Sequence, residues 1–160
     1  MIRSVSIGDT QALLDIYNYY VLNTVVTFDV EPLTLEMFQD KLKRISFEYP
    51  FIVYEENNEI FGFAYGSRFR PKPAYNHTVE STVYVKHMAH GKQIGTKLYT
   101  ELIRQLKKTD VNTILGVLTI PNDISVRLHE KFGFVQVAEL KEVGLKFGAW
   151  QDIGIWQLKL

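Results

Sequence analysis

Apolar residues recur along this chain at two spacings, one typical of strands and the other typical of helices. Alternating or continuous apolar runs predict strands over residues 2–7, 51–55, 60–67, 79–85, 112–120, 133–139 and 153–160. Apolar residues three or four apart predict helices that begin after Gly8-Asp9-Thr10, at Thr34, near Ile94 and after Asn122. Helices and strands therefore interleave along the chain.

One of these helices also predicts which side chains are buried. After the N-cap residue Thr34, the side chains of Leu35, Phe38, Leu42 and Ile45 are expected to point inward. We predict an α/β (α+β) fold, in which a mixed sheet carries helices on both faces. Residues 1–160 are expected to form a single domain.

Composition removes several classes of function. Positive and negative side chains balance at 18 each, so neither a nucleic-acid surface nor a polyanionic partner is favoured. The absence of cysteine excludes disulfides, thiolate metal sites and a cysteine nucleophile, and the histidines lack the spacing of a metal site. No apolar run reaches the ~20 residues of a membrane span, and the first residues do not resemble a signal peptide. We expect a cytoplasmic protein that binds no metal, membrane or nucleic acid.

The segment from Val79 to Ile103 carries the strongest chemical signal. A strand is followed by the short loop HGKQIG, residues 90–95, and then by a helix whose apolar residues repeat every fourth position from Ile94 to Leu106. A helix that begins at such a loop presents unpaired backbone N–H groups and the positive end of its dipole, which together bind phosphates. The segment predicts a phosphate-bearing cofactor; a plain turn before an amphipathic helix is the alternative.

The strand before this loop supplies a candidate base. Glu80, Thr82 and Tyr84 share one face of the strand by alternation, and this polar set is expected to face a substrate cleft. A solvated strand surface is the alternative, because half-exposed strands commonly alternate in this way. Further along the chain, His129 titrates near neutral pH, with a half-buried helix histidine as the alternative.

A proline-rich loop, RFRPKPAYN, joins two of the predicted strands. Arg70 and Lys72 lie two positions apart in it, which places them on one side of an extended chain. Cations on a stiffened loop suit a substrate that bears carboxylate, phosphinate or sulfoximine groups, and a solvated basic loop is the alternative.

Six segments follow one another from Ile16 to Gln157: IYNYYVLNTVVTF, RFRPKPAY, TVESTVYV, the glycine loop, IPNDISVRLHEKFGF and VGLKFGAWQDIGIWQ. In this order they resemble the GNAT acyl-CoA N-acetyltransferase superfamily, and more narrowly its phosphinothricin and amino-acid N-acetyltransferases. The resemblance implies a mostly antiparallel central sheet with a splayed central strand pair that holds the pantetheine arm of acetyl-CoA. It also implies a homodimer.

The resemblance further implies roles for individual residues. Glu80 would be the general base, and His129 would orient the cofactor sulfur, protonate the departing thiolate or help to deprotonate the amine. Acetyl-CoA would be bound by Val83, Tyr84, Val85, His90, Gly91, Lys92, Gln93, Ile94, Gly95, Thr96, Asn122 and Ser125. The substrate would be bound by Phe28, Arg70, Lys72, Tyr75, Thr82 and Tyr84.

Two further segments are open to more than one interpretation. Asn122 resembles a family asparagine that hydrogen-bonds the pantetheine arm, and a plain helix N-cap is the alternative. Phe147, Gly148 and Trp150 resemble a late loop near the cleft or at a dimer contact. An aromatic core anchor is the alternative for Trp150.

The glycine loop departs from the family pattern at two positions. His90 stands at the first position, and Gln93 replaces the middle glycine, whereas Gly95 matches and Gly91 fits a variant of the pattern. A glutamine is tolerable at that position only if its φ is negative and its side chain points away from the pyrophosphate. Whether Gln93 weakens cofactor binding therefore depends on these two conditions.

Three functions remain open at this point. The favoured one is direct acetyl transfer from acetyl-CoA to the α-amine of a small amino acid or analogue, of the phosphinothricin, methionine sulfoximine or methionine sulfone class. A polyamine, aminoglycoside or protein N-terminal acetyltransferase is the second, although the basic loop argues against a polycationic substrate. A non-catalytic acyl-CoA sensor is the third. Gln93 and His90 favour the sensor, and the presence of Glu80 together with His129 opposes it.

Overall fold

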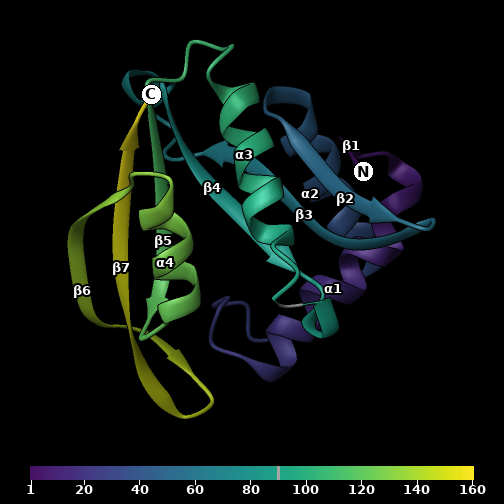
Figure 1. The fold of residues 1–160 in the computed structure, drawn as a ribbon. Helices are drawn as coiled ribbons and strands as arrows, with labels where there is room; N and C mark the ends of the chain where they lie inside the picture. The colour runs from purple at the N-terminus through teal and green to yellow at the C-terminus, as the bar shows by residue number, and fades with distance from the viewer. Residues whose placement is uncertain (90) are drawn as a thin grey trace.

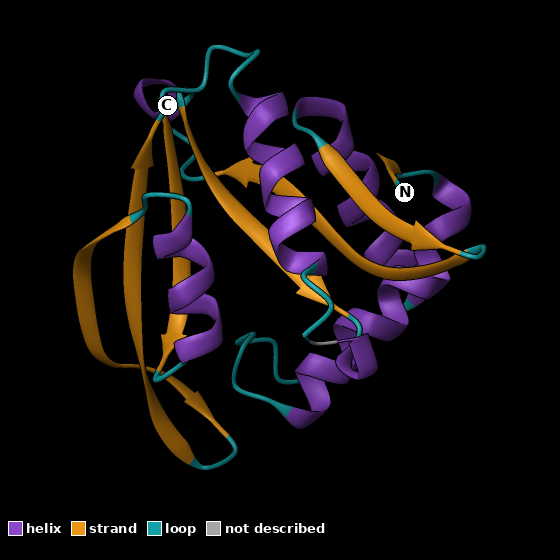
Figure 2. Cartoon of the chain, in the orientation of Figure 1, coloured by secondary structure: helices purple, strands orange, loops and turns teal. Residues whose placement is uncertain are grey.

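The computed structural model describes residues 1–89 and 91–160, so His90 of the glycine loop lies outside the described residues. Helices and strands interleave as predicted (Figures 1 and 2). The strands are β1 (Ile2–Ser4), β2 (Phe51–Glu56), β3 (Glu59–Arg68), β4 (Thr78–Val85), β5 (Thr113–Ile120), β6 (Val135–Lys146) and β7 (Ala149–Lys159). The helices are α1 (Thr10–Asn23), α2 (Leu35–Glu48), α3 (Ile94–Leu106) and α4 (Asp123–Lys131), with 3₁₀ turns η1 (Ile7–Asp9), η2 (Pro73–Tyr75) and η3 (His87–Ala89).

The strands form one mixed sheet in the order β1-β2-β3-β4-β5-β7-β6. Every neighbouring pair is antiparallel except β4 and β5, which are parallel. The two asparagines between β2 and β3 both have positive φ, as a tight hairpin turn requires. The prediction of a mixed, mostly antiparallel sheet is confirmed.

Helices cover both faces of this sheet, also as predicted (Figure 1). Alternate side chains of β2 point to opposite faces of the sheet and pack in two different hydrophobic clusters. Phe51 and Val53 pack in the cluster with α1 and α2, whereas Ile52 and Tyr54 pack with α3 on the opposite face. Burial on both faces explains why β2 reads as a continuous apolar run.

One prediction and one alternative for single apolar residues are wrong. In α2, Thr34 caps the helix and Phe38, Leu42 and Ile45 are buried as expected, but Leu35 is 43% exposed because packing begins only with Phe38. Trp150 is 60% exposed and is not a core anchor, since it pairs with Leu145 beside the two-residue turn that closes the β6–β7 hairpin.

The central strand pair is splayed. β4 and β5 pair only where Thr78–Glu80 lies beside Thr113–Leu115. Beyond that point β4 stays with β3 as far as Val85, and β5 stays with β7 as far as Ile120. The two strands therefore diverge along their length (Figure 1), and their facing backbone edges have no strand partner.

The start of α3 does not meet the first of the two conditions for Gln93, a negative φ. Its φ is +59°, in the left-handed region, and that of Gly91 is +85°. Gln93 is the N-cap residue of α3, and its carbonyl accepts the Lys97 N–H at 3.0 Å, so the turn into the helix imposes this conformation. A left-handed backbone costs a non-glycine residue roughly 1–2 kcal/mol.

Replacement of Gln93 by glycine should therefore stabilise the fold. We expect Gln93→Gly to raise the free energy of unfolding by about 1 kcal/mol, because the relief of strain exceeds the entropy that glycine loses on folding. Urea denaturation measures this change. Lys92→Gly is the matched control: its φ is not positive, so it should lose stability. A Gln93→Gly variant that is less stable than the parent would contradict the assignment of strain.

Candidate active site

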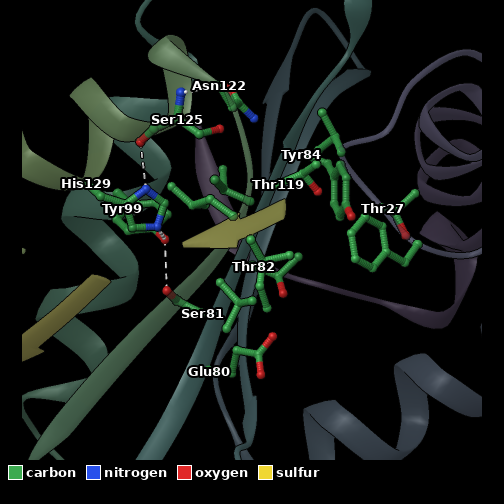
Figure 3. A pocket seen from close by; sticks show the side chains of 16 residues that line it. Thr27, Glu80, Ser81, Thr82, Tyr84, Tyr99, Thr119, Asn122, Ser125 and His129 are labelled. Carbon is green, nitrogen blue, oxygen red and sulfur yellow. Dashed lines mark hydrogen bonds between the residues drawn. The ribbon is translucent and has the colours of Figure 1, made fainter. Parts of the chain in front are cut away.

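A cavity of about 220 Å³ lies between β4 and β5 where these strands diverge (Figure 3). Its walls come from β4, β5, α3, α4 and the segment that follows α1. The lining residues are Val26, Thr27, Phe28, Glu80, Ser81, Thr82, Val83, Tyr84, Tyr99, Val117, Leu118, Thr119, Asn122, Ser125, His129 and Ile153.

Residues from both faces of β4 line this cavity. Tyr84 packs with α1, and by alternation Glu80 and Thr82 share its face of the sheet. Ser81 and Val83 belong to the opposite face, on which α3 packs. The cavity therefore passes through the sheet and is lined from both the α1–α2 side and the α3–α4 side.

Glu80 is half-buried and lies in the cavity, as predicted. Within the described part of the chain its carboxylate has neither a hydrogen bond nor an ion pair to another side chain. Burial raises the pKa of Glu80 above its usual value, because desolvation disfavours the charged form. The side chain is thus a carboxylate with free lone pairs and an increased affinity for a proton.

A buried chain of hydrogen bonds runs along the α3–α4 side (Figure 3). The Ser81 hydroxyl lies 2.8 Å from the Tyr99 hydroxyl, and the Tyr99 hydroxyl lies 2.7 Å from Nε2 of His129. Nδ1 of His129 lies 2.7 Å from the carbonyl oxygen of Ser125. Because a carbonyl only accepts, Nδ1 carries the proton in the neutral ring and Nε2 accepts from Tyr99.

This chain determines what His129 can do. The imidazole is 2% exposed, and desolvation lowers the pKa of His129 while the Ser125 carbonyl opposes the shift. Both ring nitrogens are occupied, so any exchange of protons with the cavity would pass through Tyr99. The ring packs against bare backbone of β5, since a Cβ on Gly116 would lie 2.3 Å from Nε2. The sequence analysis missed Tyr99, which stands within the apolar stripe of α3.

The first turn of α3 leaves backbone N–H groups without a side-chain cap, at the position where a phosphate-binding turn is predicted. Ile94, Gly95 and Thr96 are its first residues, and no side chain among the described residues caps this end. Nothing in the fold requires glycine at position 95, where φ is not positive and an added Cβ would make ordinary contacts. Lys92 is exposed beside this turn, with Nζ 5.7 Å from the centre of the Phe61 ring. The donor set suits a bound pyrophosphate.

Asn122 does serve as an N-cap. Its Oδ1 accepts the Ser125 N–H at 3.2 Å at the start of α4, and the residue also lines the cavity. Of the residues predicted to bind substrate, Phe28, Thr82 and Tyr84 line the cavity.

The basic loop stands apart from the cavity. Arg70, Lys72 and Tyr75 do not line it. The Arg70 guanidinium lies over the rings of Phe69 and Tyr75, 5.0 Å and 5.6 Å from their centres. The loop leads directly into β4, so it lies near the Glu80 end of the strand.

A second cavity, of about 650 Å³, lies between α1, the β2–β3 hairpin and the end of β4. It contains none of the predicted site residues; Asp15, Tyr19, Glu59 and Lys86 are among its lining.

Over residues 1–89 and 91–160, no group of acidic or histidine side chains is arranged to hold a metal ion. No helix in the same residues is long and apolar enough to cross a membrane.

Comparisons with known proteins agree with this architecture. Residues 2–155 match the model of the acetyltransferase (GNAT) domain. The chain is 38% identical to a phosphinothricin N-acetyltransferase of Streptomyces viridochromogenes over 156 residues, which cover 98% of this chain and 85% of that one. It is 34% identical to an L-methionine sulfoximine/L-methionine sulfone acetyltransferase of Salmonella typhimurium, with 99% and 94% covered.

A solved structure shows the same fold. A phosphinothricin acetyltransferase of Sinorhizobium meliloti, in complex with acetyl-CoA, superposes with a TM-score of 0.97 at 30% identity, covering 100% of this chain and 88% of that one. The family match spans nearly the whole chain, and relatives at 30–38% identity are covered over most of their length. The chain therefore belongs to the GNAT acetyltransferase family.

Proposed function

We propose that this enzyme transfers an acetyl group from acetyl-CoA directly to the α-amine of a small amino acid or analogue, of the phosphinothricin, methionine sulfoximine or methionine sulfone class. The observation that carries the proposal is the cavity through the sheet, with unpaired Glu80 on the α1–α2 side and the uncapped start of α3 on the opposite side. The curated relatives act on amino-acid analogues of this kind, as their names state.

The residues of the cofactor side fit acetyl-CoA. The open edge of β4 at Val83 and Val85 offers backbone groups to the amides of a pantetheine arm. Backbone N–H groups of Ile94, Gly95 and Thr96 would hold the pyrophosphate, and Lys92 would add positive charge. When bound, acetyl-CoA supplies an acetyl thioester as the electrophile.

Glu80 would activate the amine on the opposite side. An alkyl amine with a pKa near 10.4 is almost entirely protonated at neutral pH, so a base has to remove a proton before attack. Glu80 has no competing partner among the described side chains, and its raised pKa suits a group that takes up a proton. No cysteine is present to carry an acyl-enzyme, which favours direct transfer.

His129 would orient the cofactor sulfur through Tyr99. Of the roles that the resemblance implies, this one best fits a neutral ring without an N–H group directed at the cavity. Imidazole ¹⁵N chemical shifts near neutral pH test it: Nδ1 should be protonated and Nε2 unprotonated. A proton on Nε2 alone, or on both nitrogens, would contradict this role and favour direct proton donation by His129.

Arg70, Lys72 and Tyr75 would attract the anionic end of the substrate from the rim. The loop that carries them leads into the strand of Glu80, and Phe28, Thr82 and Tyr84 would contact the rest of the molecule. Anionic groups pair with such cations, whereas a polyamine would be repelled.

A homodimer is also proposed. The β6–β7 hairpin ends the sheet at its β6 edge and exposes an unusual number of large apolar side chains. These are Val135, Val137, Leu140, Val143, Leu145, Phe147 and Trp150. A second copy would cover them, so sedimentation velocity should give twice the 18.6 kDa chain mass. A monomer at working concentration would contradict this proposal.

Release of thiol from acetyl-CoA tests the function directly, since the protein contributes no thiol of its own. We expect turnover with phosphinothricin, methionine sulfoximine or methionine sulfone, and little with glutamate or spermidine. Glu80→Gln should reduce turnover by about 10²-fold or more, because the amine loses its base. Glu139→Gln, at an exposed carboxylate of β6, is the control and should retain activity. Turnover on spermidine alone would assign a polyamine substrate, and binding of acetyl-CoA without turnover of any amine would favour a sensor.

The pH profile provides a second test of Glu80. The base acts only when ionised, and burial raises its pKa, so activity should fall with decreasing pH before the usual carboxyl range is reached. In a plot of log(kcat/KM) for the amine against pH, the slope should increase by one unit below the pKa of Glu80. Ionisation of the amine itself affects parent and variant equally, so Glu80→Gln should lack only this additional slope. If the variant keeps the additional slope, another group causes it.

A further inference from the structure

Lys146 near the end of β6 is a buried cation that the proposed chemistry does not use. Its side chain is 3% exposed, and Nζ donates to the carbonyl oxygen of Thr27 at 2.7 Å. Desolvation lowers the pKa of Lys146, while the charge of Asp29 opposes the shift. Among the described residues, no carboxylate lies within 4.0 Å of this ammonium, so its burial is costly. The hydrogen bond to Thr27 and the ring of Phe147, whose centre is 5.1 Å from Nζ, compensate part of that cost.

The acceptor of this hydrogen bond belongs to the cavity wall. Val26, Thr27 and Phe28 follow α1 without regular structure and form the α1–α2 side of the cavity. The hydroxyl of Thr119 in β5 donates to the Val25 carbonyl at 2.7 Å, one residue before this wall begins. The Thr27 hydroxyl lies 3.0 Å from that of Tyr17 in α1. The wall is thus an irregular segment whose position depends on groups from three other elements.

Strand β6 supports this wall at a second point. The ring of Phe28 packs against Gly144, where an added Cβ would fall 2.3 Å from a ring carbon. Gly144 and Lys146 are two residues apart, so they share one face of β6. One side of a single strand therefore holds both the backbone of Thr27 and the ring of Phe28.

We propose that Lys146 is a positioning residue for the acceptor amine: its ammonium fixes the Thr27 carbonyl and thereby sets the wall from Val26 to Phe28 against which the amino-acid substrate binds. The proposal rests on the proposed function, since it needs the α1–α2 side to be the amine side. It assigns Lys146 no contact with acetyl-CoA, whose proposed partners lie on β4, α3 and α4. Loss of the ammonium should weaken binding of the amine alone.

Kinetics of Lys146→Met test the proposal. We expect KM for the amine to rise about tenfold or more, as for loss of a hydrogen bond to a charged group, and KM for acetyl-CoA to stay unchanged. Lys141→Met, at an exposed lysine of the same strand, is the control and should change neither constant. Gly144→Ala should also raise KM for the amine, because it displaces Phe28 while the ammonium stays in place. An equal rise in both constants, or none, would overturn the proposal.

Chemical modification of a cysteine variant tests whether the charge of the Lys146 side chain matters or only its packing. The chain contains no cysteine, so Lys146→Cys can be alkylated at a single site. Denaturation, reaction with 2-bromoethylamine and refolding restore an ammonium on an arm of lysine's length, and 1-bromopropane supplies an apolar arm of the same length. The aminoethyl form should recover the parent KM for the amine, and the propyl form should not. Equal recovery by both arms would show that packing alone matters.

Exchange of backbone amides can be measured without turnover, so it tests the positioning role of Lys146 separately from the proposed acetyl transfer. Hydrogen–deuterium exchange of residues 24–33 should accelerate in Lys146→Met and not in Lys141→Met. Unchanged exchange would refute the positioning role even if an acceptor is found. If exchange accelerates in Lys146→Met but the parent protein acetylates no amine, Lys146 does hold the wall in place. The proposed acetyl-transfer function would then be wrong, and so would the role of Lys146 in substrate binding.

Discussion

The divergence of β4 from β5 after Glu80 is the constraint on which the rest of this site depends. Two parallel strands that share only three register pairs, from Thr78–Glu80 to Thr113–Leu115, leave facing edges whose backbone groups have no strand partner. A ligand that pairs with such an edge replaces the missing strand. The same divergence lets side chains from both faces of the sheet meet in one cavity, and Glu80 lies at the point where the strands separate.

Buried polar contacts hold the two sides of this gap differently. On the α3–α4 side, the chain from Ser81 through Tyr99 to His129 is satisfied at each group and links β4 to both helices. On the α1–α2 side, the wall has no regular structure and depends on single contacts such as Lys146 with Thr27. The proposed cofactor side is thus built into regular elements, whereas the proposed amine side is an irregular segment, which suits substrate selection on a common scaffold.

Local patterns in the sequence predicted the elements, the caps at Thr34 and Asn122, and the placement of Glu80 in a cleft, because each depends on residues a few positions apart. Long-range contacts were not accessible in this way. Lys146 and Thr27 lie 119 residues apart, and no local pattern marks either of them. The φ of Gln93 was not accessible for a related reason: the turn into α3, and not the residue type, sets its positive value.

Amide chemical shifts recorded during titration with coenzyme A test whether acetyl-CoA binds in the gap between β4 and β5. We expect the largest changes in Thr82–Val85 of β4 and in Ile94–Thr96 of α3, with smaller ones along β5. Changes confined to the second cavity, around Asp15, Tyr19 and Glu59, with β4 and α3 unaffected, would contradict it.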